Sequence, residues 1–180
     1  MRHKPINLIT ALLTVGAIAI WSSSVNGQSV RGPLRIGTYD SRAIAVAYAR
    51  SGEYQNYVRG LKAELEKAKA AKDERRVKEL ETWGPVTQAR LHEQGFSTGS
   101  VKNIMDRIKD SVPGIAREAS VSMILSKWEV VYGDPSVEYV DVTLPLVKLF
   151  NPDERTLRIV EEVSKHEPIP LEKLEPELKK

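Results

Sequence analysis

The stretch Val130–Thr143, VVYGDPSVEYVDVT, differs in character from the sequence before it. The preceding residues are mostly charged and have the composition of helices, whereas this stretch is rich in the β-branched and aromatic side chains that favour strands. Gly-Asp-Pro-Ser at 133–136 interrupts it with residues typical of a turn. The stretch therefore predicts a small patch of sheet near the end of a largely helical chain.

Other segments have the pattern of strands. Leu34–Tyr39 alternates in the manner of a short strand, and two β-branched runs follow later, at Val121–Leu125 and Glu129–Tyr132. We expect the segments 34–39 and 121–142 to be hydrogen-bonded into one common layer.

Caps and breakers mark where helices meet this sheet. Asp40 and Ser41 are good N-cap residues and directly follow the first strand, so a helix is expected to begin there. Thr143 is the expected cap of a short helix over Leu144–Phe150, which Asn151–Pro152 ends.

The region 42–119, between the strands, predicts a helical hairpin. Apolar residues from Tyr54 to Ala68 recur in steps of four and three, the spacing of a coiled-coil seam. The strict pattern fails at Lys72, but the strongest helix breaker, Gly84–Pro85, lies near the midpoint of the region. We therefore predict the tip of the hairpin at Gly84–Pro85, with Trp83 beside it.

Two more breaks fall in the second half of this region. Gly95–Gly99 is expected to interrupt the returning arm, and Pro113–Gly114 is expected to bend it. Between and after these breaks, the apolar residues from Val101 to Ala119 keep heptad-like steps.

Residues 1–27 have the order of a secretory signal. Arg2 and Lys4 precede an apolar run from Leu8 to Trp21, and small residues follow up to Gly27. We predict cleavage after Gly27. The alternative is an uncleaved membrane anchor, for which the run is short, because a spanning helix needs about 20 apolar residues.

Composition excludes several classes of protein. Of the 180 residues, 41% are hydrophobic and 28% are charged, which suits one domain with a modest core. Removal of Arg2 and Lys4 leaves 25 basic against 24 acidic residues, so charge does not imply nucleic acid as a partner. Cysteine is absent, which excludes a disulfide-stapled fold and a thiol nucleophile.

Taken together, these signals resemble the Skp/OmpH family of periplasmic chaperones. The resemblance covers residues 34–151, within an expected domain of residues 28–151, while residues 152–180 extend beyond the usual end of the family. The residues that carry it are Ile36–Asp40 at the front and Val131, Tyr132, Gly133, Asp134, Pro135, Ser136, Val137, Asp141, Val142, Thr143, Val147 and Asn151 at the back.

The resemblance implies an α+β fold in which a coiled-coil-like helical hairpin projects from a small β body. It further implies a periplasmic homotrimer whose strands build a common body and whose arms enclose unfolded outer-membrane and other envelope proteins. Neither enzymatic activity nor a cofactor comes with this family.

The hairpin carries the residues that we predict to contact such clients: Lys62, Lys69, Lys72, Arg75, Arg76 and Trp83. Cations would attract acidic segments, and a tryptophan at the tip could touch a client or a membrane surface. The alternatives are a solvated helix face for the cations and packing against the opposite arm for Trp83.

The sequence predicts no catalytic or metal site. His92 and His166 lack a second metal ligand at helical spacing. Asp40, Asp134 and Asp141 lie where caps and turns favour aspartate.

The last segment divides into two parts. Asp153–Val163 predicts a short helix with Leu157, Val160 and Val163 on one side, and Pro168–Pro176 predicts an extended, proline-punctuated tail that is mobile or lies along another surface. The hairpin tip or this tail would be the contact surface in the alternative function, a non-chaperone structural or adaptor protein of the envelope.

Overall fold

A computed structural model gives the fold of residues 32–178. These residues mix helices and strands, as expected for the α+β class. The predicted signal segment, 1–27, lies outside the described residues.

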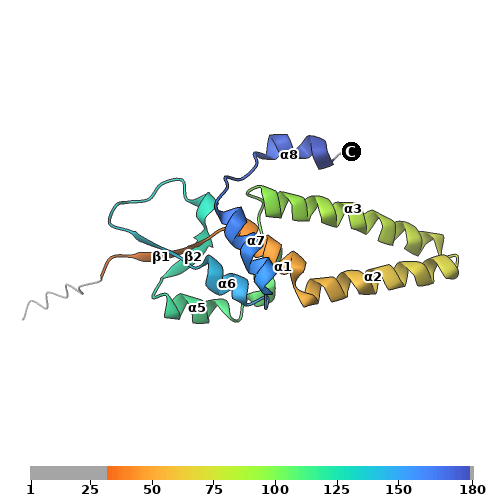
Figure 1. Ribbon diagram of the computed structural model, residues 1–180, viewed down its shortest axis with the longest axis horizontal. Coiled ribbons are helices and arrows are strands. Elements are labelled where there is room, and N and C mark those ends of the chain that lie inside the picture. Colours follow the sequence, from red (N-terminus) through yellow and green to blue (C-terminus); the bar gives the residue numbers. More distant parts are fainter. Residues whose placement is uncertain (1–31, 179–180) are drawn as a thin grey trace, which may run out of the picture. The chain divides into compact units, whose positions relative to one another are not determined.

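The strands form one three-stranded parallel sheet (Figure 1). β1 (Arg35–Tyr39) is central, β2 (Met123–Ser126) pairs on one side, and β3 (Glu138–Asp141) pairs on the other. The register joins Ile36 to Met123 and Tyr39 to Ser126, which confirms the common layer expected from the sequence.

Close packing within the sheet requires a glycine at one position. Gly37 is buried, and a Cβ atom there would lie only 2.9 Å from Cγ1 of Ile124. A larger residue would therefore push β2 away from β1.

Helix α1 (Ser41–Arg50) follows β1 and forms the centre of the hydrophobic core. Asp40 caps it by accepting a hydrogen bond from the backbone N–H of Arg42. α1 packs against α6 (Thr143–Lys148) and α7 (Glu154–Ser164), and Ile44 and its neighbours are therefore fully buried. The helix predicted over 153–163 is confirmed as α7.

The hairpin is shorter than expected and turns elsewhere. Its arms are α2 (Gly52–Ala70) and α3 (Glu74–Phe96), so Pro85 lies inside α3 rather than at the tip. The turn occurs at Lys72, which has a φ of 55°, and Asp73 caps α3 through its side chain. A residue in the left-handed conformation ends a helix as effectively as a breaker pair does.

The segment after α3 is not the returning arm of the hairpin, which corrects the predicted span of 42–119. It forms two short helices, α4 (Lys102–Ile108) and α5 (Val112–Glu118), whose buried residues join the core around α1. Pro113 lies in the first turn of α5, where a missing N–H costs little, so it helps to start a helix rather than bend one.

One of the predicted strands does not form. Glu129–Tyr132 is not a strand: a 3₁₀ turn spans Lys127–Glu129, and Val131 and Tyr132 are 98% and 78% exposed, because no strand lies beside them in the described residues. Strand propensity alone does not form a strand without a hydrogen-bonding partner.

The tail is not extended throughout, because α8 (Leu171–Leu178) is a helix beside α3. The backbone N–H of Ile169 donates to the carbonyl of Phe96 at 2.8 Å, and Leu174 is only 3% exposed. The residues of α3 that the tail contacts are far from it in sequence, so the composition of the tail could not indicate these contacts.

Helices long and apolar enough to cross a membrane do not occur within residues 32–178.

Candidate functional site

Asp40 lies at the end of the central strand and is the most buried acid that the sequence singled out, at 1% exposed. Its carboxylate accepts hydrogen bonds from the Arg42 guanidinium at 2.8 and 3.1 Å and pairs with Nζ of Lys127 at 2.9 Å. The indole N–H of Trp128 donates to it at 3.3 Å, and the Arg42 guanidinium lies 4.9 Å from the centre of the Trp128 ring.

These contacts decide the charge state of Asp40. Burial alone would raise the pKa of its carboxyl, but hydrogen bonds from Arg42 and Lys127, together with their positive charge, hold the pKa below its ordinary value. Both oxygens are occupied by donors from the chain itself, so this carboxylate joins β1 to the segment after β2 rather than serving as a general acid or base.

Asp141 and Thr143 connect the same end of β1 to α6. The hydroxyl oxygen of Thr143 accepts from the backbone N–H of Asp40 at 2.9 Å, although 103 residues separate the two in sequence. The backbone N–H of Thr143 donates to the Asp141 carboxylate at 2.8 Å. Asp141, not the Thr143 hydroxyl, is therefore the side chain that binds a backbone N–H at the start of α6.

The remaining signature residues have local roles. Asp134 accepts from the backbone N–H of Ser136 at 2.8 Å and so closes the predicted turn, with Pro135 between them. A Cβ atom on Gly133 would lie 2.6 Å from the Tyr139 hydroxyl oxygen, so a larger residue there would require the exposed Tyr139 side chain to move. Asn151 follows α6 with a φ of 51°.

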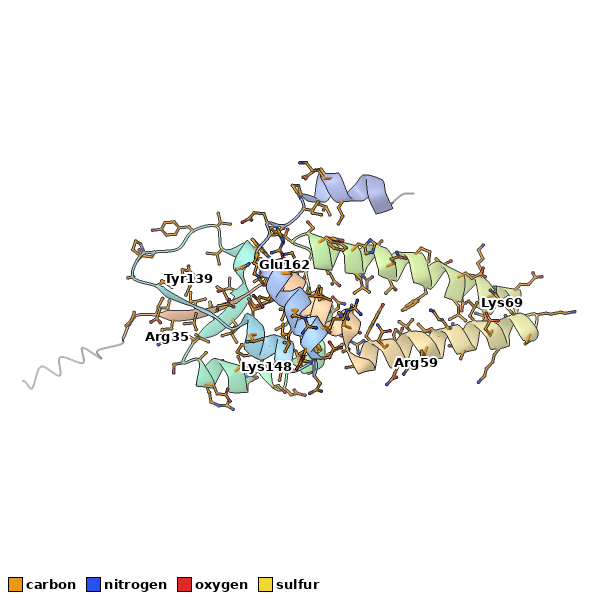
Figure 2. The ribbon with its side chains drawn as sticks, in the orientation of Figure 1. Arg35, Arg59, Lys69, Tyr139, Lys148 and Glu162 are labelled. Carbon is orange, nitrogen blue, oxygen red and sulfur yellow. The ribbon has the colours of Figure 1, made fainter. Side chains whose placement is uncertain are left out.

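The predicted client-binding cations divide into two groups. Near the hairpin tip, carboxylates of the hairpin itself pair with three of them: Lys69 with Glu81 at 3.2 Å, Arg75 with Glu79 at 2.8 Å, and Arg76 with Glu64 at 2.7 Å. Figure 2 shows Lys69 close to the tip, and Lys72 is the turn residue itself. Much of this charge thus stabilises the turn locally.

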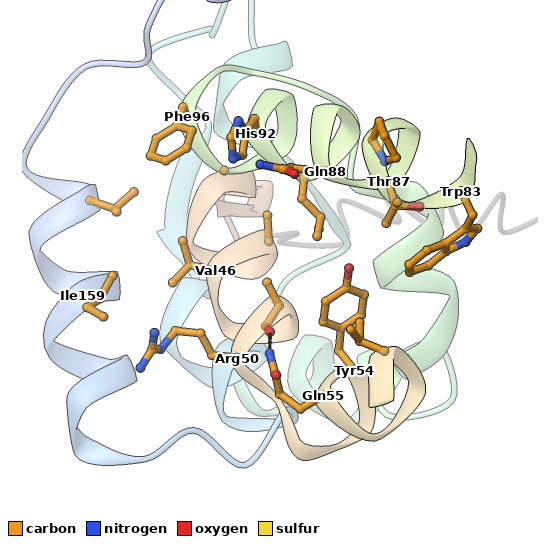
Figure 3. Close-up of a pocket in the computed structure, with 18 of the residues that line it drawn as sticks. Val46, Arg50, Tyr54, Gln55, Trp83, Thr87, Gln88, His92, Phe96 and Ile159 are labelled. Atoms are coloured by element: carbon orange, nitrogen blue, oxygen red, sulfur yellow. Dashed lines mark hydrogen bonds between the residues drawn. The ribbon is translucent and has the colours of Figure 1, made fainter. Parts of the chain in front are cut away.

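Lys62 and Trp83 lie elsewhere, on the wall of a groove of about 730 Å³ at the root of the hairpin (Figure 3). We call it the root groove. Its walls come from α1, α2, α3 and α7, and the side chains that dominate them are apolar or aromatic: Val46, Tyr54, Trp83, Leu91, Phe96 and Ile159.

Trp83 is therefore not an exposed tip residue. Its ring packs edge-on against Tyr57, with ring centres 5.5 Å apart, and its side chain is half-buried. The predicted packing against the opposite arm is confirmed, while contact of Trp83 with a client stays a prediction. Burial, with a smaller effect of Tyr57, raises the pKa of the Tyr54 hydroxyl, which also lines the groove.

Sequence reasoning predicted Lys62 and Trp83, which both line the root groove, as client contacts, but it did not predict the groove itself. The seam pattern included Tyr54 and Val58, but as helix packing, and nothing in the sequence indicates that Val46 and Ile159 meet α3. The groove depends on four helices that only the folded chain brings together.

Within residues 32–178, no three His, Asp or Glu side chains gather as metal ligands. Comparison with family models, curated proteins and solved structures gives no match for this chain.

Proposed function

We propose that this chain is a non-enzymatic, holdase-like chaperone of the Skp/OmpH type that acts in the periplasm on unfolded outer-membrane and other envelope proteins. The observation that carries the proposal is the root groove, a wide apolar surface left open beside a helical hairpin. Apolar pockets of 300–1,000 Å³ are the usual sites for small molecules in folded proteins, and a groove of this size would accept the apolar side chains of a short polypeptide segment.

Two features support the Skp/OmpH relationship. Strands at both ends of the helical region pair in one sheet, as the resemblance implies. The signature residues Asp40, Asp141 and Thr143 are joined by hydrogen bonds at the end of β1, so these separate motifs support one another in space.

We also propose that the chain forms a homo-oligomer, a trimer by resemblance. β2 and β3 are the outer strands of the sheet among the described residues, and exposed apolar side chains lie on or next to the strands (Leu34, Met123 and Tyr139) and in the loop that precedes β3 (Val131 and Tyr132). Open strand edges and exposed apolar side chains favour association. The mass of the chain in solution tests this, and a strict monomer would contradict it.

An aggregation assay tests the holdase function. An outer-membrane protein diluted from denaturant is expected to scatter less light when this chain is present at a near-stoichiometric ratio. Thr87→Trp places a large side chain in the root groove and should abolish most of this protection. Thr82→Trp is the matched control, because Thr82 is exposed on the same helix and does not line the groove.

The adaptor function stays as a second proposal because the root groove has room for one short segment rather than a whole unfolded chain. No protection from aggregation, together with capture of one native envelope protein that Thr87→Trp prevents, would favour the adaptor.

A further inference from the structure

The charges that line the root groove are all of one sign. Arg50 and Lys62 are its charged residues, with His92 nearby, and among the described lining residues none is Asp or Glu. The chain as a whole carries 24 acidic residues, so this segregation is a local feature.

The two cations differ from those at the hairpin tip in their partners. Nε of Arg50 donates to the neutral hydroxyl of Thr156 at 2.9 Å, and no ion pair joins Arg50 or Lys62 to a carboxylate within the described residues. Asp153, at the start of α7, is near enough for Arg50 to affect it, but its carboxylate accepts the backbone N–H of Thr156 at 2.7 Å. Positive charge at the groove thus stays available to an occupant.

One wall of the groove comes from the C-terminal extension, residues 152–180. Ile159 and Val163 belong to α7, which lies beyond the part of the sequence that resembles the Skp/OmpH family. The same helix supplies the Thr156 hydroxyl that positions Arg50. Both the apolar wall and the placement of this cation therefore depend on the C-terminal extension.

We propose that the root groove selects short apolar polypeptide segments flanked by acidic residues. This rests on the proposed function, in which the occupant is a polypeptide, and it names the class of segment. Aromatic and aliphatic side chains of the segment would contact Tyr54, Trp83 and Phe96, while its carboxylates pair with Arg50 and Lys62. Charge complementarity of this kind gives specificity more than raw affinity.

Calorimetric titration of the whole chain with three short synthetic peptides tests the proposal. The peptides share one Leu/Phe core and carry flanks of Asp/Glu, of Gln or of Lys. The acidic peptide should bind about three- to tenfold tighter than the Gln peptide, because each exposed pair contributes modestly. The Lys peptide should bind weakest, and high salt should remove the preference.

Matched variants locate the effect. Lys62→Gln should reduce the advantage of the acidic peptide and leave the Gln peptide unchanged. Lys67→Gln makes the same charge change on the same helix, outside the groove lining, and should alter neither. Thr87→Trp should abolish binding of all three peptides.

The failures are distinguishable. Equal affinity for the three peptides, all lost in Thr87→Trp, would overturn the acidic selectivity and leave the proposed function intact. Binding of a single-chain anionic amphiphile in place of any peptide would overturn both. Self-association that Thr87→Trp prevents, without peptide binding, would show that a second copy of the chain occupies the groove and would also overturn the proposal.

Discussion

The sheet-centred body and the α2–α3 hairpin use the same ion-pair chemistry in opposite surroundings. The side chains of Asp40 and Arg42 are 2% and 3% exposed, whereas those of Glu64 and Arg76 are 47% and 37% exposed. When one partner of a buried pair is removed, the other charge is left unpaired in the interior. When one partner of an exposed pair is removed, water hydrates the remaining charge. The loss of folding stability on removing one partner should therefore depend on how buried the pair is, not on how many pairs a region contains.

The largest expected effect is that of Asp40→Ala. It leaves Arg42 buried without its carboxylate, which should lower the free energy of unfolding by about 3–5 kcal/mol. Chemical denaturation measures this. Glu64→Ala is the matched change in the hairpin and should leave the unfolding midpoint nearly unchanged. Similar losses for the two variants would contradict the comparison.

Protonation of Asp40 at acid pH should remove part of its contribution to the free energy of unfolding. The loss should be smaller than in Asp40→Ala, because a protonated Asp40 keeps its shape and some hydrogen bonds. The pKa of Asp40 is lowered in the folded state, so its contribution is complete above the unfolded-state pKa, near 4, and is lost as pH falls through the folded-state pKa. The stability difference between the wild type and Asp40→Asn should stay constant from neutral pH to about pH 5 and shrink below pH 4. A difference that already shrinks above pH 5 would show a raised pKa instead.

The smallest expected effect lies in the hairpin, where Pro85→Ala should be stabilising. Proline inside a helix removes one backbone hydrogen bond and crowds the preceding turn, and alanine restores the bond, partly offset by a freer unfolded chain. We expect a gain of about 1–2 kcal/mol in the local opening free energy of α3, measured by amide hydrogen exchange. A loss of stability would mean that the proline itself is needed for the local conformation or packing of α3, and Gly60→Ala in α2 serves as a helix-propensity control.

The same contrast explains what the sequence could predict. The three strands and the Asp40 cap follow from local signals that agree with their surroundings, and α6 ends at Lys148, shortly before the predicted break at Asn151–Pro152. The coiled-coil spacing of α2 is also matched by burial, since its seam residues from Tyr54 to Ala68 are buried or half-buried.

The errors arose where a local signal competed with tertiary contacts. Gly84–Pro85 is the stronger breaker on paper, yet the failed seam position at Lys72 was the true sign of the turn. The pairs Lys69–Glu81 and Arg76–Glu64 join the two arms beside this turn, but exposed pairs of this kind contribute little to its stability. The helical tail likewise depends on Phe96, and the root groove depends on four helices, so neither has a signal in any single segment.

The position of β1 in the sheet has a consequence for how the chain reaches its fold. Among residues 32–178 this strand comes first in sequence but pairs only with strands that begin at Met123 and Glu138, whereas the hairpin spans Gly52–Phe96. Distant pairings of this kind raise contact order and slow folding, because a long loop must close before any contact compensates for it. We therefore expect α2 and α3 to pair early in folding, whereas the backbone groups of β1 stay unpaired until β2 and β3 dock beside it.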